Sequence, residues 1–359
     1  IAARTQSFTI GDGLQVRLLP KKTRGGTVIV DANFRFADEA AVTGRAEAGE
    51  WAGSMLMMGS KTMTREQISA RFDALKTNAS VDGSLQGARI GLLGRRETLA
   101  DALALAADIL RNPAFPADQF EQLRLQAVTG LESQRSEPSA IASRALSRHF
   151  DPWPKSHPYA SRTLDESLAA LKAVTLDQVR AFHADLYGTS VGEIVIVGDF
   201  DPVAVKAQLQ ALFADWKAPV AYAPIRTRYT PVPATRATFT TPDKPNAVVV
   251  ARHNLSLNTV DADFPALNIA NMILGGDSLK SRLADRIRQR EGLSYTVGSG
   301  LSADNSREGR DDAGSLNMQA ITAPQNAAKV EAALREEFTR IVEQGVTEQE
   351  VRDAVASVL

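Results

Sequence analysis

An arginine and a tyrosine, Arg288 and Tyr295, stand seven residues apart in the sequence. A guanidinium carries several N–H donors and a phenol carries one O–H donor, so the pair could hold a peptide carbonyl and the oxyanion that forms from it. Both residues also suit structural roles. An arginine is favoured at a helix C-terminus by the helix dipole, and a core tyrosine commonly forms a hydrogen bond through its hydroxyl. The spacing by itself leaves both interpretations open.

The residues around this pair predict a helix, a turn and a strand. Asp277 or Ser278 can cap the start of the helix. Gly292 suits the left-handed residue just past the helix end. The alternation over residues 293–297 predicts a half-buried strand with Tyr295 on its apolar face. The buried stripe of the helix consists of residues four positions apart, namely Leu279, Leu283 and Ile287.

The composition is that of a soluble globular protein, with 44% hydrophobic and 23% charged residues in a chain of 359. The formal net charge is −1 and no block of like charge occurs, so we expect no nucleic-acid or membrane-surface partner. The apolar runs are too short to span a membrane. The sequence lacks cysteine, which excludes disulfides, a thiolate zinc site and a cysteine nucleophile.

The two ends of the sequence lead us to expect that the chain is part of a longer protein. The chain begins at Ile1 and ends within a helical pattern, Glu348–Leu359. We expect that N- and C-terminal segments are missing and that a removed signal peptide is one explanation for the start.

An internal repeat predicts two similar halves. Residues 95–110 resemble residues 324–338, and residues 116–128 resemble residues 347–359, at an offset of about 230 residues that is typical of a duplicated domain. We therefore predict two α+β halves, the second cut short, with capping boxes opening helices at Thr64, Thr175 and Thr347. The predicted divisions are an N-terminal domain at 1–218, a proline-rich linker at 219–235 and a C-terminal domain at 236–359.

The motif around the arginine and tyrosine, SRL-x4-R-x3-GL-x-Y, resembles the C-terminal-half signature of the M16 family, which includes insulinase, pitrilysin and mitochondrial processing peptidase. The order of His157-Pro158-Tyr159, the helical residues 168–187 and the strand 194–197 also resembles bacterial M16B-type subunits. The resemblance implies an antiparallel sheet with helices on one face in each half. It further implies that Arg288 and Tyr295 contact substrate opposite a zinc site.

Active M16 subunits carry HxxEH on a helix of the first half, where the two histidines bind zinc and the glutamate activates water. The corresponding positions here are Glu50, Gly53 and Ser54, so the resemblance implies a degenerate site and no metal in this chain. The third zinc ligand of the family falls near Glu132, which is either a remnant or an ordinary surface residue. None of the four histidines has HxxEH spacing: His149, His157, His183 and His253.

Bound zinc lowers the pKa of water to about 7, so without its ligands we expect this chain to be inactive alone. The resemblance favours a non-metal-binding subunit of a heteromeric zinc metallopeptidase, with Arg288 and Tyr295 acting on a partner's site. That partner would be an HxxEH-bearing subunit in a heterodimer or heterotetramer, and the substrate would be a peptide. The alternatives are an inert scaffold, like the core subunits of respiratory complexes, and an unrelated α+β protein. We expect a periplasmic location, with the cytoplasm as the alternative.

Overall fold

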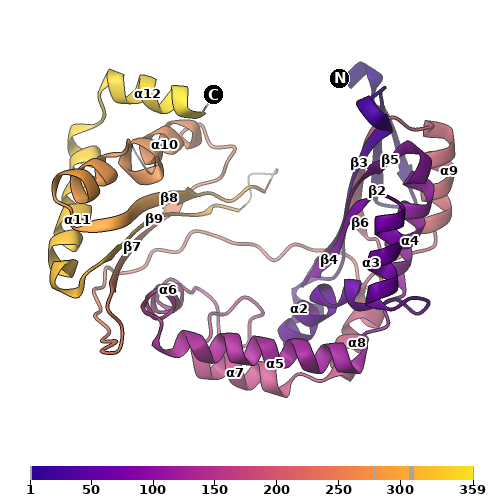
Figure 1. The fold of residues 1–359 in the computed structure, drawn as a ribbon, viewed down its shortest axis with the longest axis horizontal. Coiled ribbons are helices and arrows are strands. Elements are labelled where there is room, and N and C mark those ends of the chain that lie inside the picture. Colours follow the sequence, from indigo (N-terminus) through magenta and orange to yellow (C-terminus); the bar gives the residue numbers. More distant parts are fainter. Residues whose placement is uncertain (1, 278–279, 307–310, 359) are drawn as a thin grey trace. The chain divides into compact units, whose positions relative to one another are not determined.

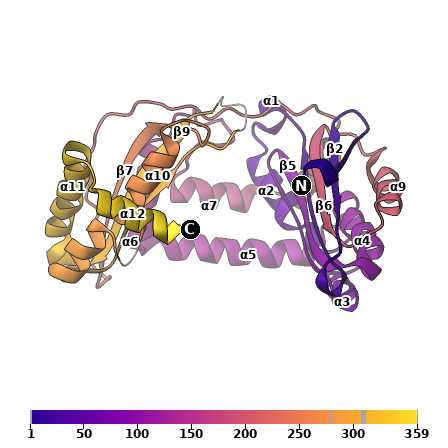
Figure 2. The same cartoon turned by 90° about the horizontal axis from the view of Figure 1, so that it is seen from above.

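The computed structural model describes residues 2–277, 280–306 and 311–358 (Figures 1 and 2). The predicted cap Ser278 and the predicted stripe residue Leu279 lie outside these residues. The chain forms two compact units. Unit 1 comprises residues 1–129, 156–159 and 166–225, and unit 2 comprises residues 130–155, 160–165 and 226–359. The boundaries predicted at residues 218 and 236 rest on the proline-rich linker between them and stay a prediction.

Unit 1 is built on a six-stranded sheet in the order β1-β2-β6-β3-β5-β4. Four of its five strand pairs are antiparallel, as predicted, but β2 and β6 run parallel. The reason is that β6 inserts between β2 and β3, which point in opposite directions, so it must run parallel to one of them. The strands are β1 (Gln6–Ile10), β2 (Leu14–Pro20), β3 (Thr27–Arg35), β4 (Asn78–Ser84), β5 (Gly87–Arg95) and β6 (Val191–Gly198).

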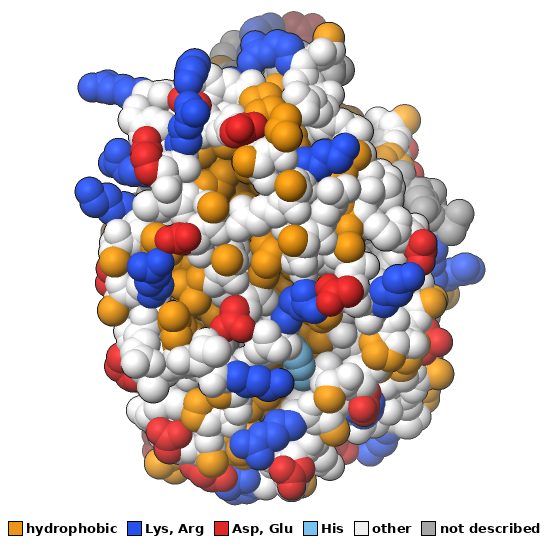
Figure 3. All heavy atoms as spheres, turned by 90° about the vertical axis from the view of Figure 1, so that its right-hand side faces the viewer, with side chains coloured by type: hydrophobic (Ala, Val, Ile, Leu, Met, Phe, Trp, Pro, Cys, Tyr) orange, Lys and Arg blue, Asp and Glu red, His pale blue; other side chains and the backbone are white. Residues whose placement is uncertain are grey.

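Helices cover one face of this sheet. The buried residues of β3 alternate with exposed ones, as expected for a strand with one face in the core. Figure 3 looks onto the helical side, where acidic and basic side chains are interspersed and neither sign dominates. The helices in this part of the chain are α1 (Glu39–Val42), α2 (Ala46–Ser54), α3 (Arg65–Ala74), α4 (Leu99–Arg111), α7 (Leu164–Ala173), α8 (Leu176–Leu186) and α9 (Pro202–Phe213), while α5 (Ala117–Ser133) runs on into unit 2.

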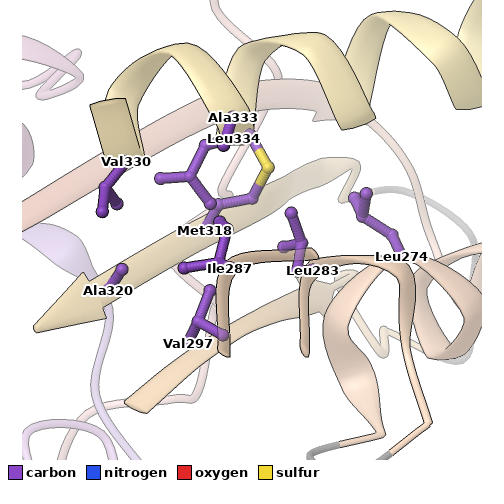
Figure 4. Close-up of a cluster of buried hydrophobic side chains, with 9 residues drawn as sticks. All are labelled: Leu274, Leu283, Ile287, Val297, Met318, Ala320, Val330, Ala333 and Leu334. Atoms are coloured by element: carbon purple, nitrogen blue, oxygen red, sulfur yellow. The ribbon is translucent and has the colours of Figure 1, made fainter. Parts of the chain in front are cut away.

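Unit 2 holds a three-stranded antiparallel sheet in the order β7-β9-β8. Its apolar core lies between the sheet and α11, where Leu283 and Ile287 pack with Met318 and Leu334 (Figure 4). The strands are β7 (Ala247–Ser256), β8 (Ser294–Ser302) and β9 (Ala313–Thr322). The helices are α6 (Pro138–His149), α10 (Phe264–Asn271), α11 (Ala327–Gln344) and α12 (Glu348–Val358), with π-helical segments at η6 (Met272–Gly276) and η7 (Ala284–Arg290).

The two units repeat one motif, which confirms the predicted duplication. The strand order β3-β5-β4 in unit 1 matches β7-β9-β8 in unit 2, and a helix follows β5 and β9 alike. In each unit a glycine lets a helical segment approach the edge strand: a Cβ on Gly53 would lie 2.1 Å from the carbonyl oxygen of Gly83, and one on Gly275 would lie 2.6 Å from the nitrogen of Ser299. Among the described residues, no helix is both long enough and apolar enough to cross a membrane.

Candidate functional site

The helix that carries Arg288 is a π-helix, a wider form than the predicted α-helix. Its last turn closes with a hydrogen bond from the Glu291 nitrogen to the Arg286 carbonyl, five residues back, at 3.0 Å. Such turns are rare and occur often at functional sites. Before this helix, just after η6, the Asp277 carboxylate accepts a hydrogen bond from the Lys280 nitrogen at 3.1 Å. Gly292 has φ +58°, so its predicted left-handed conformation is confirmed.

The predicted placement of Tyr295 on the buried face of the strand is wrong. Ser294 pairs with Thr322 and Thr296 pairs with Ile321, so Tyr295 is the extra residue of a β-bulge. The bulge shifts the alternation by one position. Ser294 is therefore 6% exposed and Tyr295 is 82% exposed. A tyrosine this open has its hydroxyl available to a ligand, which a core tyrosine would not.

The structure brings Arg288 and Tyr295 together. The guanidinium carbon of Arg288 lies 4.9 Å from the centre of the Tyr295 ring, which is a cation–π contact. Within the part of the chain that the structure describes, the Arg288 side chain forms no hydrogen bond or ion pair. Among the described residues, its N–H donors therefore have no acceptor.

The other arginines of this segment are held by carboxylates. Arg286 pairs with Glu291 at 2.9 Å, and also with Glu336 and Glu337 of α11. Arg282 pairs with Glu350, and Arg290 pairs with Asp285. These ion pairs hold the segment in place. Arg288 differs from the other three arginines because it forms no ion pair with a described residue.

The ion pair between Arg282 and Glu350 predicts a loss of stability in acid. The hydrogen bonds from Arg282, with help from Thr347, lower the pKa of Glu350 from 4.5 to about 2. Because this pKa is depressed in the folded state, the stabilisation is present above pH 4.5 and is lost as the pH falls towards 2. The Glu350 side chain is 30% exposed, so we discount the shift for solvent screening and expect about 1–2 kcal/mol.

Urea unfolding of the wild type and Glu350→Gln at pH 7 and pH 3 checks this. The difference between their free energies of unfolding should shrink by roughly half or more at pH 3. A difference that is equal at both pH values would contradict the assignment.

The degenerate motif lies on α2, packed against β4. The Cα atom of Gly53 faces the backbone of Gly83, and a Cβ on Gly83 would in turn lie 2.1 Å from the Tyr187 hydroxyl. The Ser54 hydroxyl donates a hydrogen bond to the Trp51 carbonyl of its own helix at 3.2 Å. The Glu50 side chain reaches solvent, although partial desolvation raises its pKa. One carboxylate and a serine, with no room for a side chain at Gly53, do not fit a zinc site.

The other polar candidates have local partners. Glu132 is exposed and pairs with Arg135 at 3.1 Å, as an ordinary surface carboxylate does. Over residues 2–277, 280–306 and 311–358, no three His, Asp or Glu side chains gather closely enough to hold a metal ion. Each histidine contacts a neighbour in its own unit. His149 forms a hydrogen bond with the Pro233 carbonyl, and His183 forms one with the Leu110 carbonyl. His157 lies 3.5 Å from the Glu39 carboxylate, and the His253 ring packs against Phe338.

Two features, one in each unit, were not predicted from the sequence. Gly83 lies opposite Gly53, and a glycine inside a strand often marks such a close approach of another backbone. Ser294 was expected on the solvent side of its strand. The structure buries both Ser294 and its cross-strand neighbour Thr322, at 6% and 4% exposure. The sequence carries no local signal for the bulge.

The family comparison agrees with the motif and the duplicated fold. Residues 173–358, just over half of the chain, match the family model described as peptidase M16 inactive domain. The chain belongs to the peptidase M16 family. The match contains both Arg288 and Tyr295.

Other M16-like relatives are distant. An uncharacterized zinc protease of Mycobacterium tuberculosis is 24% identical over 69% of this chain, and the aligned region spans 55% of that protein. The chain thus spans about half the length of these mycobacterial relatives. A non-peptidase homolog, YmxG of Helicobacter pylori, is 21% identical over 84% of this chain and 66% of its own length.

Solved M16-like structures share the fold. A peptidase M16 inactive domain from Pseudomonas fluorescens has a TM-score of 0.79 at 22% identity, covering 99% of this chain and 83% of that one. The periplasmic protease PqqL of Escherichia coli has a TM-score of 0.73 at 14% identity, covering 98% of this chain and 39% of that one. At these identities the likeness establishes the fold of the M16 chain and nothing finer.

Proposed function

We propose that this M16 chain is the non-metal-binding subunit of a heteromeric zinc metallopeptidase. Its partner is an M16 subunit with an intact HxxEH motif, which supplies zinc and the general base. This chain supplies Arg288 and Tyr295, which hold the carbonyl of the peptide substrate while it becomes an oxyanion.

The observation that carries this proposal is the Arg288–Tyr295 pair. The guanidinium stacks on the ring at 4.9 Å, and Tyr295 is 82% exposed. Exposing a tyrosine ring and leaving a guanidinium unpaired among the described residues contributes little to the stability of unit 2 itself. Donors arranged in advance around a developing negative charge are, in contrast, a large source of transition-state stabilisation.

The close packing of Gly53 against Gly83 supports the proposal that the partner, and not this chain, supplies the zinc and the general base. A general-base side chain cannot be placed at position 53 without moving the backbone of β4. The chemistry that HxxEH performs in active members must therefore come from another chain if this one takes part in hydrolysis.

The second candidate is an inert scaffold. The similarity to a protein described as a non-peptidase homolog favours it. It predicts assembly with a partner but no contribution of Arg288 and Tyr295 to turnover. The effect of substituting these two residues on turnover therefore distinguishes the two candidates.

Co-expression with an HxxEH-bearing M16 chain from the same genome tests the proposal. We expect the two chains to co-elute, zinc to be bound by the complex but not by this chain alone, and hydrolysis of a fluorogenic peptide to require both. A partner whose HxxEH glutamate is replaced by glutamine is the control and should abolish hydrolysis.

Two results would overturn the proposal. One is stoichiometric zinc in the isolated chain. The other is equal hydrolysis by the partner with and without this chain.

A periplasmic location is part of the proposal, so the complex should be recovered from a periplasmic extract. Recovery from the cytoplasmic fraction alone would contradict that part.

A further inference from the structure

A buried hydroxyl lies at the bulge that turns Tyr295 outward. The Oγ atom of Ser294 is 2.8 Å from the Thr296 carbonyl and 2.6 Å from the Ile321 carbonyl of the neighbouring strand, and its single proton is shared between them. On the opposite strand, the Thr322 hydroxyl donates to the Leu293 carbonyl. Two buried hydroxyls therefore hold the backbone of both strands, at Leu293 before the extra residue and at Thr296 after it.

The alternative to this bulge is a regular ladder. Side chains alternate between the two faces of a strand. If Tyr295 paired in the ladder like its neighbours, it and the residues before it would each point to the opposite face of the sheet. Ser294 would then face solvent and Tyr295 would enter the core beside Val297. The Ser294 hydroxyl opposes this change, because it bonds Thr296 and Ile321 only when Ser294 itself is the inward residue.

We propose that Ser294 is a positioning residue for the arginine–tyrosine pair. Its hydroxyl holds Tyr295 out of the ladder, with the ring against Arg288 and the phenol facing solvent. The role of Ser294 in turnover rests on the function proposed above, whereas its effect on the geometry of Tyr295 does not.

Nuclear magnetic resonance of the isolated chain with labelled arginine measures this geometry directly. Stacking on an aromatic ring shifts the resonance of the Arg288 side-chain N–H, and Tyr295→Ala supplies the unstacked reference. We expect Ser294→Ala to move this resonance towards the reference and Ser294→Thr, which keeps the hydroxyl, to leave it near the wild-type position. Ser302→Ala is the matched control, because its hydroxyl bonds Ser315 on the same pair of strands, away from the bulge.

Kinetics of the assembled complex give the functional readout. A small misplacement of a group that contacts the transition state costs about 10²-fold in rate, so Ser294→Ala should lower kcat by about 10- to 100-fold with little change in KM. Ser294→Thr should recover most of the loss. If Ser294→Ala does not fold, Thr322→Val tests the same bulge from the opposite strand and should shift the Arg288 resonance in the same direction.

The outcomes separate the two proposals. An unshifted Arg288 resonance in both Ser294→Ala and Thr322→Val would overturn the positioning role. A shifted resonance with unchanged kcat would support the positioning role and contradict the catalytic use of the pair.

Discussion

Tyr295→Phe is expected to lower the turnover of the assembled two-chain peptidase by about 10²–10³-fold, which corresponds to roughly 2.7–4 kcal/mol of transition-state stabilisation. The substitution removes one hydroxyl and keeps the ring, so the contact with Arg288 at 4.9 Å is preserved. Tyr295 is 82% exposed, and its hydroxyl forms no hydrogen bond with any residue that the structure describes. The folded state of unit 2 should therefore be nearly unaffected, and gel filtration should show an intact complex.

Arg288→Ala should lower turnover to a similar or greater extent, because it removes a charge together with its donors. Arg290→Ala is the matched control. Arg290 lies two residues along the same segment and is paired with Asp285 at 2.6 Å, so its charge is already compensated. We expect Arg290→Ala to keep wild-type turnover.

Steady-state kinetics on a short fluorogenic peptide distinguish three roles of the pair. A fall in kcat indicates that the donors act in the transition state, whereas a rise in KM at constant kcat indicates binding of the ground-state peptide. Wild-type kcat and KM in the Tyr295→Phe complex would mean that the pair is structural and would favour the scaffold alternative.

Restoring the HxxEH residues is expected to damage the fold rather than create a peptidase. The full change is Glu50→His, Gly53→Glu and Ser54→His. The middle substitution is the costly one, because a Cβ at position 53 would lie 2.1 Å from the Gly83 carbonyl oxygen. The contact is with backbone atoms, and the Tyr187 hydroxyl also lies close to Gly83, so neither α2 nor β4 can shift without a large cost in free energy. We expect Gly53→Glu to lower the free energy of unfolding by about 3 kcal/mol or more.

Urea unfolding of the single variants tests this reasoning. Ser54 and Glu50 have exposed side chains, so Ser54→His and Glu50→His should each change the free energy of unfolding by no more than about 0.5 kcal/mol. We expect the triple variant to bind zinc weakly at best, since the groups that orient the ligands are also absent. A stable triple variant with stoichiometric zinc and peptidase activity would show that the helix can move away from β4.

Features made by neighbouring residues were determined by the sequence alone. The capping boxes at Thr64 and Thr175 formed as predicted, and Thr347 exchanges hydrogen bonds with Glu350. Gly292 took its left-handed conformation. These interactions join residues three positions apart or concern one residue's backbone, so the chain needs no distant partner to form them. The repeat likewise predicted the duplicated fold.

Features that depend on a second strand were decided only by the tertiary structure. The outward turn of Tyr295 comes from its register with β9, and hydrogen bonds from Ser294 and Thr322 hold that register. The glycine contact between α2 and β4 depends on residues 30 positions apart, with Tyr187 behind them. The parallel pairing of β2 with β6 requires a strand that returns after nearly the whole of unit 1. Alternation within a single strand cannot reveal an extra residue, because a bulge is defined only against its partner strand.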